Sequence, residues 1–251
     1  MNKPLVSVVM TVFKRTEYLE EAIKSVLNQT FKDFELIITD DANTEAARAI
    51  SQRFSYDTRV RYRSNPTILG APLNMAAALK EAQGEFVTLF NDDDLMEPDM
   101  LESLLPPLQS DPQCIVSFGD HWAMNCSGEI LPELSKKRSH DSGTANLPVG
   151  EIKTPFSLTV RAAASFVMGT MFRKSTYCED WLPVEVAGAY DCWLAMRFSL
   201  AEGRFYFTPK CVMRWRIHPN SESARRDSEK AICSVYIFKS LLLLKIPDDE
   251  R

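Results

Sequence analysis

The chain has 251 residues, of which 45% are hydrophobic and 25% are charged, and these values are typical of a globular protein with a substantial core. The formal net charge of −5 argues against a dedicated nucleic-acid binder, which usually carries a basic surface. The six cysteines are scattered without a CxxC pair. This pattern argues against a structural zinc site and favours reduced thiols in a cytoplasmic protein.

Neither end of the chain predicts a membrane-spanning segment. The N-terminus lacks the small-residue cleavage pattern of a secretory signal, and no stretch is long and apolar enough to span a bilayer. The nearest candidate, 231–246, is short and carries two lysines, so it favours a C-terminal helix that packs on the core. The alternative is peripheral contact with the inner face of a membrane through its basic flanks.

The first half of the chain alternates segments typical of strands with segments typical of helices. Thr16 is expected to cap the first helix. Strands separated by helices of about ten residues predict a doubly wound, mostly parallel α/β sheet flanked by helices. The expected strands are 5–13, 34–39, 60–63, 85–90 and 114–118, and the expected helices are 16–27, 45–54, 71–82 and 98–108.

Beyond residue 119 the periodicity weakens. Residues 128–154 contain Gly, Pro, Ser and Lys with little pattern, and they predict a long loop or short hairpins of the kind that often shapes a binding site. Further strands are expected at 166–173, 205–207 and 212–217, with a helix around 191–202.

Two acidic clusters follow expected strands, Asp40-Asp41 and Asp92-Asp93-Asp94. Open α/β sheets bind ligands at the carboxyl ends of their strands, so both clusters are placed at a candidate site. Mg²⁺ and Mn²⁺ prefer oxygen ligands, and Mg²⁺ is usually bound by one or two carboxylates plus substrate phosphates. The alternative is that these residues belong to solvated loops or helix N-termini, where Asp is also favoured.

The common phosphate-binding loops are missing from the sequence. It has neither GxGxxG, which would indicate a dinucleotide site, nor GxxxxGK[ST], which would indicate a P-loop. The remaining way to hold a phosphorylated substrate is a metal on carboxylates with basic side chains nearby.

Several motifs in order along the chain resemble the family 2 glycosyltransferases, which have the GT-A fold. Residues 6–15 resemble the family's first strand, 22–31 its helix ending in "S-V-L-N-Q-T-F", and 34–41 its second strand with an acidic end. Residues 84–98 match a strand, the DXD-type metal motif and a downstream proline. The resemblance resumes at 169–173, 190–197 and 216–223.

The resemblance implies a role for each of eleven residues. Asp191 is implied as the catalytic base, Asp93 and His218 as ligands of Mn²⁺ or Mg²⁺, and Arg216 as a partner of the diphosphate. The implied nucleotide-binding residues are Thr11, Phe13, Arg15, Asp41, Asn65, Asn74 and Asp92. Taken singly, Phe13 could instead belong to the core, and Asp41, Asp94 and Asp191 could instead cap helices.

The implied activity is an inverting transfer of a sugar from a nucleotide-diphosphate sugar, with a UDP-sugar favoured, to an acceptor hydroxyl. A saccharide, a lipid-linked or a protein-linked acceptor would fit, in the synthesis of surface polysaccharide or glycoconjugates. Residues 1–120 would bind the nucleotide-sugar, and residues 121–230 would form a smaller region for the acceptor and the catalytic base. Residues 231–251 would form a C-terminal helix, compatible with truncation of a longer chain.

Two departures from the family pattern leave alternatives open. Asn91 stands where many members have the first Asp of the metal motif, and Tyr190 stands where an acidic residue usually precedes the catalytic Asp. A non-catalytic nucleotide-sugar-binding or scaffold module therefore stays open, as does a nucleotidyltransferase. The sequence does not indicate the oligomeric state.

Overall fold

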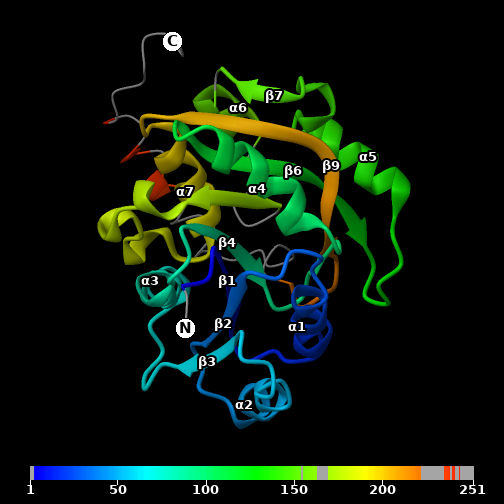
Figure 1. Cartoon of the computed structure of the whole chain (residues 1–251), viewed down its shortest axis with the longest axis vertical. Coiled ribbons are helices and arrows are strands. Elements are labelled where there is room, and N and C mark those ends of the chain that lie inside the picture. Colours follow the sequence, from blue (N-terminus) through cyan, green and yellow to red (C-terminus); the bar gives the residue numbers. More distant parts are fainter. Residues whose placement is uncertain are drawn as a thin grey trace.

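The computed structural model describes residues 3–153, 155–162, 169–221, 235–237, 239–240 and 243. Within these residues one sheet of nine strands runs through the molecule, with helices on both faces (Figure 1). The strands are β1 (Val6–Val12), β2 (Phe34–Asp40), β3 (Val60–Ser64), β4 (Phe86–Asn91), β5 (Leu95–Met96), β6 (Cys114–Met124), β7 (Gly150–Ile152), β8 (Thr170–Arg173) and β9 (Arg204–Arg216). The helices are α1 (Leu19–Leu27), α2 (Glu45–Gln52), α3 (Ala71–Glu81), α4 (Met100–Ser110), α5 (Pro132–Asp141), α6 (Pro155–Ala162) and α7 (Tyr190–Ser199).

The strand order is β3-β2-β1-β4-β8-β6-β9-β5, and β7 pairs with β9. Strands β1 to β4 pair in parallel, as do β6 and β9, whereas β8 runs antiparallel between β4 and β6. The short strands β5 and β7 are antiparallel to β9. The predicted α/β class, a mostly parallel sheet flanked by helices, is confirmed.

The central strand β1 is buried on both faces of the sheet. Successive side chains of a strand point to opposite faces, so Val8 and Met10 pack with α1 and α4, whereas Val9 packs with α3 on the other face. A strand covered on both faces is mostly apolar, which explains the apolar run of β1, whose polar residues are Ser7 and Thr11. The same arrangement leaves its C-terminal end at the edge where the acidic clusters lie.

Two local predictions are wrong. Helix α1 begins at Leu19, and the residue at its N-cap position is Tyr18 with no side-chain cap, so Thr16 does not cap it. The long loop or short hairpins expected at 128–154 are replaced, within the described residues 128–153, by helix α5 and by strand β7, which pairs with β9. Helix α5 is polar around most of its circumference and buries Ser135, so it has no apolar stripe from which a helix could be predicted.

The two strands expected at 205–207 and 212–217 are parts of one long strand, β9. Opposite Pro209 and Lys210, the pairing of β9 with β6 shifts its register between Gly119 and Asp120. Such a bulge accommodates a proline that has no N–H to donate, so the strand continues where the sequence suggests an end.

The remaining boundaries differ by a few residues or fall outside the described residues. The helix expected at 191–202 is α7, which ends at Ser199. The strand expected at 166–173 is β8, which begins at Thr170, and residues 163–168 lie outside the description. Most of the expected helix 231–246 also lies outside it. None of the helices in the described ranges has the length and apolar character needed to cross a membrane.

Gly84 lies where β4 passes closest to the start of β1. A Cβ at this position would be 2.5 Å from the Ser7 backbone nitrogen and 2.7 Å from the Val6 carbonyl carbon. Backbone atoms in a paired strand cannot yield as a flexible side chain can, so we expect Gly84→Ala to lower the free energy of unfolding by about 1–3 kcal/mol. Urea denaturation measures this change, and a variant as stable as the wild type would contradict it.

Candidate active site

Both acidic clusters lie at the carboxyl ends of parallel strands, β2 and β4, which flank β1. Asp92 directly follows β4, and Thr11 near the end of β1 pairs with Asn91 at the end of β4. Asp41 follows β2, and its backbone N–H donates to the carbonyl of Val12 at 3.0 Å. The end of β1 therefore lies between the two clusters and joins them into one edge.

Asp94 has a structural role. It is fully buried, and its two oxygens accept hydrogen bonds from the Arg216 backbone N–H at 2.9 Å and from the Asn91 amide at 3.2 Å. Burial, followed by the neighbouring charge of Asp93, raises the pKa of Asp94 well above its usual value. The N-cap position of α4 is Asp99, so the alternative that Asp94 caps this helix is wrong.

Asp92 is buried with one oxygen unused. Its side chain is 9% exposed, and Oδ2 has no hydrogen-bond partner among the described residues. Burial and the charge of Asp93 raise the pKa of Asp92 to about 8, against the opposing effect of Arg15. A buried carboxylate oxygen without a partner is unfavourable, so this atom is a candidate ligand for a cation or a donor group.

Asp93 faces two basic side chains. Its Oδ2 lies 3.1 Å from Nε2 of His218 and 3.3 Å from Nη2 of Arg15. Arg15 also lies 3.9 Å from Oδ1 of Asp92 and donates to the backbone carbonyl of Asn220. Arg15 thus lies beside both carboxylates and links the β1 loop to the segment after β9.

A tight turn places Arg15 beside these carboxylates. The Arg15 N–H donates to the Phe13 carbonyl at 2.7 Å, and Lys14 between them has a φ of 62°. A three-residue turn with positive φ at its centre is a rare, strained conformation for a non-glycine residue, and such strain is concentrated at functional sites. Phe13 is 45% exposed, so the alternative that it is a core residue is wrong.

Arg216 at the end of β9 is 1% exposed, and each of its three guanidinium nitrogens donates a hydrogen bond within the protein. Nε donates to the Asp93 carbonyl at 2.8 Å, Nη1 to the Cys126 carbonyl at 3.0 Å and Nη2 to the Glu21 carboxylate at 2.7 Å. The guanidinium also lies 4.2 Å from the centre of the Tyr18 ring. Arg216 therefore positions the acidic loop, and its contact with a diphosphate stays a prediction.

The start of α7 faces the same acidic loop. Ala189 is at the N-cap position, so the alternative that Asp191 is the N-cap is wrong. The Cys192 N–H donates to Oδ1 of Asp191 at 2.7 Å. Burial, followed by the charge of Asp191, raises the pKa of Tyr190, and the charges of Asp92 and Asp93 raise it further. The Tyr190 side chain also hydrogen bonds to Thr11. Tyr190 was noted in the sequence as a departure, and its contact with Thr11 was not predicted.

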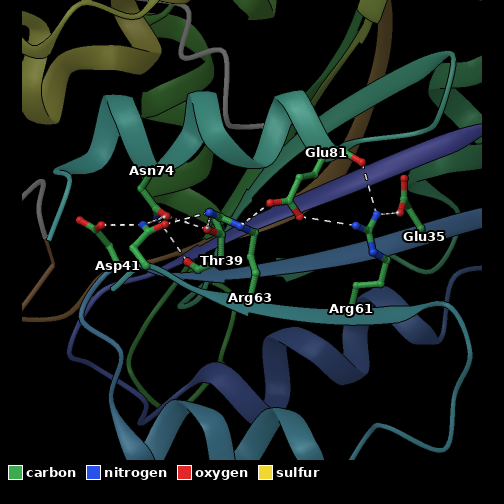
Figure 2. Close-up of polar contacts among 8 residues, drawn as sticks. Glu35, Thr39, Asp41, Arg61, Arg63, Asn74 and Glu81 are labelled. Atoms are coloured by element: carbon green, nitrogen blue, oxygen red, sulfur yellow. Dashed lines mark hydrogen bonds and ion pairs between the residues drawn. The ribbon is translucent and has the colours of Figure 1, made fainter. Parts of the chain in front are cut away.

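Asp41 lies at one end of a second polar cluster (Figure 2). Its Oδ1 accepts from the Asn65 amide and from the Leu69 N–H, both at 2.8 Å, and its Oδ2 accepts from the Gly70 N–H at 2.9 Å. Helix α2 is capped by Thr44, so the alternative that Asp41 caps it is wrong. Of the predicted nucleotide-binding residues, Asp41, Asn65 and Asn74 therefore meet in one place.

The predicted residues of this second cluster continue into a network that the sequence did not predict. Asn74 Oδ1 accepts from the Asn65 amide at 2.8 Å and from the Thr39 hydroxyl at 2.6 Å. Arg63 donates to Asn65 at 2.8 Å and to Thr39 at 2.6 Å. Arg63 is on β3 and Asn65 directly follows this strand, so their spacing of two residues is the signal that could have placed them on one side of it.

The carboxylates fit a divalent cation only as part of a larger site. No group of three or more His, Cys, Asp or Glu side chains that could hold a metal alone is found within the residues described. However, Asp92 supplies an unpartnered buried oxygen, and Asp93 and His218 lie beside it. This set suits a cation whose remaining ligands are phosphate oxygens and water. Asp93 and His218, the two predicted metal ligands, thus fit Mn²⁺ or Mg²⁺.

Comparison with known proteins identifies the family. The family model for "Glycosyl transferase family 2" matches residues 7–164, which is more than half of the chain. The chain belongs to glycosyltransferase family 2. An uncharacterized glycosyltransferase of Methanocaldococcus jannaschii is 27% identical over 96% of this chain and 80% of its own length. The predicted enzyme class, a glycosyltransferase, is therefore confirmed, and the alternatives of a non-catalytic module and a nucleotidyltransferase are not supported.

A second relative of this family 2 glycosyltransferase is a Campylobacter jejuni enzyme named GalNAc(5)-diNAcBac-PP-undecaprenol beta-1,3-glucosyltransferase. It is 38% identical over 53% of this chain, and the match spans 47% of that enzyme. Among solved structures, S. aureus TarS 1–349 in complex with UDP-GlcNAc has a TM-score of 0.73 at 17% identity, over 98% of this chain and 68% of that one. A mannosyltransferase of Pyrobaculum calidifontis with GDP-Man and Mn²⁺ has a TM-score of 0.70 at 17% identity, over 99% and 67%. These likenesses show the GT-A fold.

Because Oδ2 of Asp92 is buried without a partner among the described residues, we expect removal of the Asp92 charge to stabilise the protein. We expect Asp92→Asn to raise the free energy of unfolding of the metal-free protein by about 1 kcal/mol, because a buried charge next to Asp93 is lost. A raised pKa means that the folded state keeps a proton that the unfolded state has released, so stability falls as pH rises from about 4 to 8.

The increase in the free energy of unfolding of Asp92→Asn over the wild type should therefore be larger at pH 9 than at pH 6. Urea denaturation with a chelator present measures it. Asp93→Asn is the matched control, and it should give no gain because Asp93 accepts from Arg15 and contacts His218. A loss of stability in Asp92→Asn would contradict the interpretation.

Proposed function

We propose that this glycosyltransferase transfers a sugar from a UDP-sugar to an acceptor hydroxyl with inversion at the anomeric carbon. The observation that carries the proposal is that Tyr190, which directly precedes Asp191 at the start of α7, hydrogen bonds to Thr11 at the end of β1 and lies within electrostatic reach of Asp92 and Asp93. A candidate base is thereby brought next to a candidate diphosphate site. Direct displacement needs a base on the acceptor side and charge stabilisation on the leaving-group side.

The hydrogen bonds of Asp41 support uracil as the base. A carboxylate has about four lone-pair positions. Oδ1 already accepts two hydrogen bonds and Oδ2 accepts one, from donors in the described part of the chain. One position is left, on Oδ2. A single remaining acceptor suits the one imide N–H of uracil, whereas guanine presents N–H groups from two adjacent nitrogens and would need both oxygens.

Other side chains at this edge would hold the rest of the nucleotide. We assign Phe13, which is exposed next to β1, to packing against the base, and Thr11 and Asn65 to the pocket wall. Asn74 supports this wall through its hydrogen bonds to Asn65 and Thr39. Asp92 would accept from a ribose hydroxyl or serve as a second metal ligand through its unpartnered oxygen.

Asp93 and His218 are the residues that would hold Mn²⁺ or Mg²⁺. Bound there, the cation would supply positive charge that stabilises the negative charge developing on the departing UDP. Arg15, which is 32% exposed beside Asp93, is placed to move from the carboxylates to a phosphate. Arg216 would act through the acidic loop that it holds, since each of its three guanidinium nitrogens already donates a hydrogen bond within the protein.

Asp191 would act as the base. The acceptor oxygen forms a bond to the anomeric carbon as its proton passes to the Asp191 carboxylate. The bond from the same carbon to the diphosphate oxygen breaks on the opposite side, and UDP leaves with its electron pair. One displacement inverts the anomeric centre and needs no covalent enzyme intermediate. General-base assistance of this kind accelerates reactions by about 10²–10⁴-fold.

Residues 121–230 would form the acceptor side, in surface polysaccharide or glycoconjugate synthesis. The name of the C. jejuni relative specifies an undecaprenol-diphosphate-linked acceptor, which supports a lipid-linked acceptor here. Such an acceptor would place the protein at the cytoplasmic face of a membrane, in peripheral contact with it.

The donor is tested by a thermal-shift panel of UDP-, GDP- and dTDP-sugars, each with and without Mn²⁺. We expect a Mn²⁺-dependent rise in Tm with the UDP-sugar, because a ligand that binds only the folded state stabilises it by mass action. The rise should be lost in Asp93→Ala, whose folding is checked by its own melting transition. A larger rise in Tm with GDP-sugars than with UDP-sugars would overturn the assignment of uracil as the nucleotide base.

The role of Asp191 as the catalytic base is tested with Asp191→Asn. We expect kcat to fall about 10²–10⁴-fold while the affinity for UDP, measured by titration, stays within about twofold. The matched control is Asp180→Asn, an acidic residue in the short helix Glu179–Trp181 that has no role in the proposed chemistry. An α-configured donor should give a β-linked product, read from the anomeric proton coupling by NMR, and retention would contradict the mechanism.

A further inference from the structure

A line of polar side chains runs from Asp41 along β3 to the far end of α3 (Figure 2). Arg63, on β3, is the branch point of this line. Its three guanidinium nitrogens donate to Glu81 at 2.9 Å, to Thr39 at 2.6 Å and to Asn65 at 2.8 Å. It thus joins helix α3, strand β2 and the loop that carries Asn65.

Arg63 fixes the direction of the hydrogen bonds around it, because a guanidinium can only donate. Asn65 must present its amide oxygen to Arg63, so its NH₂ group is directed to Asp41 and Asn74, at 2.8 Å each. The Thr39 oxygen accepts from Arg63, so its hydroxyl proton is left to donate to Asn74. The direction of each hydrogen bond in the network is set from two ends, by Arg63, which can only donate, and by the Asp41 carboxylate, which can only accept.

We propose that Arg63 is a positioning residue of the nucleotide-base pocket and contributes to selection of the base. By holding the Asn65 oxygen, it directs an N–H donor onto Oδ1 of Asp41 and leaves Oδ2 as the acceptor for the base. A pocket with a fixed acceptor favours uracil, whose N3 carries a proton, over cytosine, whose N3 is itself an acceptor. This inference rests on the proposed contact between Asp41 and the base.

The neighbouring Arg61 separates this role from a general contribution to folding. Arg61 also lies on β3, and its guanidinium contacts Glu81 at 3.5 Å and Glu35 at 2.8 Å. Its hydrogen bonds are to Glu35 and Glu81, not to Asn65 or Thr39. The two arginines therefore share a strand and a partner on α3, but only Arg63 reaches the base pocket.

The test compares Arg63→Gln with Arg61→Gln. Dissociation constants are measured by isothermal titration, with Mn²⁺ present, for UDP, CDP and pyrophosphate. In Arg63→Gln we expect binding of UDP to weaken about three- to tenfold, as expected for loss of one or two hydrogen bonds, with binding of pyrophosphate unchanged. The preference for UDP over CDP should fall by a similar factor. Arg61→Gln should keep all three values.

Kinetics supply a second readout. A misplaced base pocket should raise the KM for the UDP-sugar in Arg63→Gln and leave kcat within about twofold, whereas general destabilisation would lower the Tm of both arginine variants without changing the nucleotide preference. If the wild type prefers UDP over CDP and Arg63→Gln keeps that preference, the proposed role of Arg63 is overturned, but the assignment of Asp41 to the nucleotide base is not. Equal binding of UDP and CDP by the wild type would overturn the assignment of Asp41 to the base, and the inference with it.

Discussion

The site depends on how the fold holds three adjacent carboxylates at the end of a buried strand. Asp92, Asp93 and Asp94 would repel one another, and burial increases that repulsion because the surroundings screen charge poorly. The end of β9 compensates through Arg216, whose backbone N–H contacts Asp94 and whose guanidinium contacts the Asp93 carbonyl. The length of β9 follows from this, since it must reach from the far side of the sheet to the acidic loop.

The two acidic clusters divide their roles in the same way. In each, one carboxylate is bound by backbone N–H groups of the protein, and another keeps an acceptor position without a partner among the described residues. Asp40 accepts from the N–H groups of Ala42 and Thr44, whereas Asp41 keeps one acceptor position. Asp94 accepts from the N–H of Arg216 on β9, whereas Asp92 has an unpartnered oxygen.

The sequence predicted those features whose cause is local. The apolar run of β1 and the acidic residues after β2 and β4 reflect burial and strand ends, and both are visible along the chain. The sequence did not predict the features that depend on contacts between elements far apart along the chain. Helix α5 has no apolar stripe, and the bulge opposite Pro209 exists because β6 shifts its register. The role of Arg63 also depends on pairing, because β2, β3 and α3 must assemble before Thr39, Asn65 and Glu81 surround one guanidinium.

The clamp between β9 and the acidic loop joins residues that are far apart in the sequence. Asp94 and Arg216 are separated by 122 positions. During synthesis the acidic loop therefore emerges long before the strand that holds it, and the parallel strands β1 to β4 can form while three carboxylates are still exposed to water. The contacts of Arg216 with Asp94 and with the Asp93 carbonyl form only when β9, the last strand of the sheet, has been synthesised. A shorter nascent chain can form the parallel layer of β1 to β4, but its acidic loop lacks the strand that positions it.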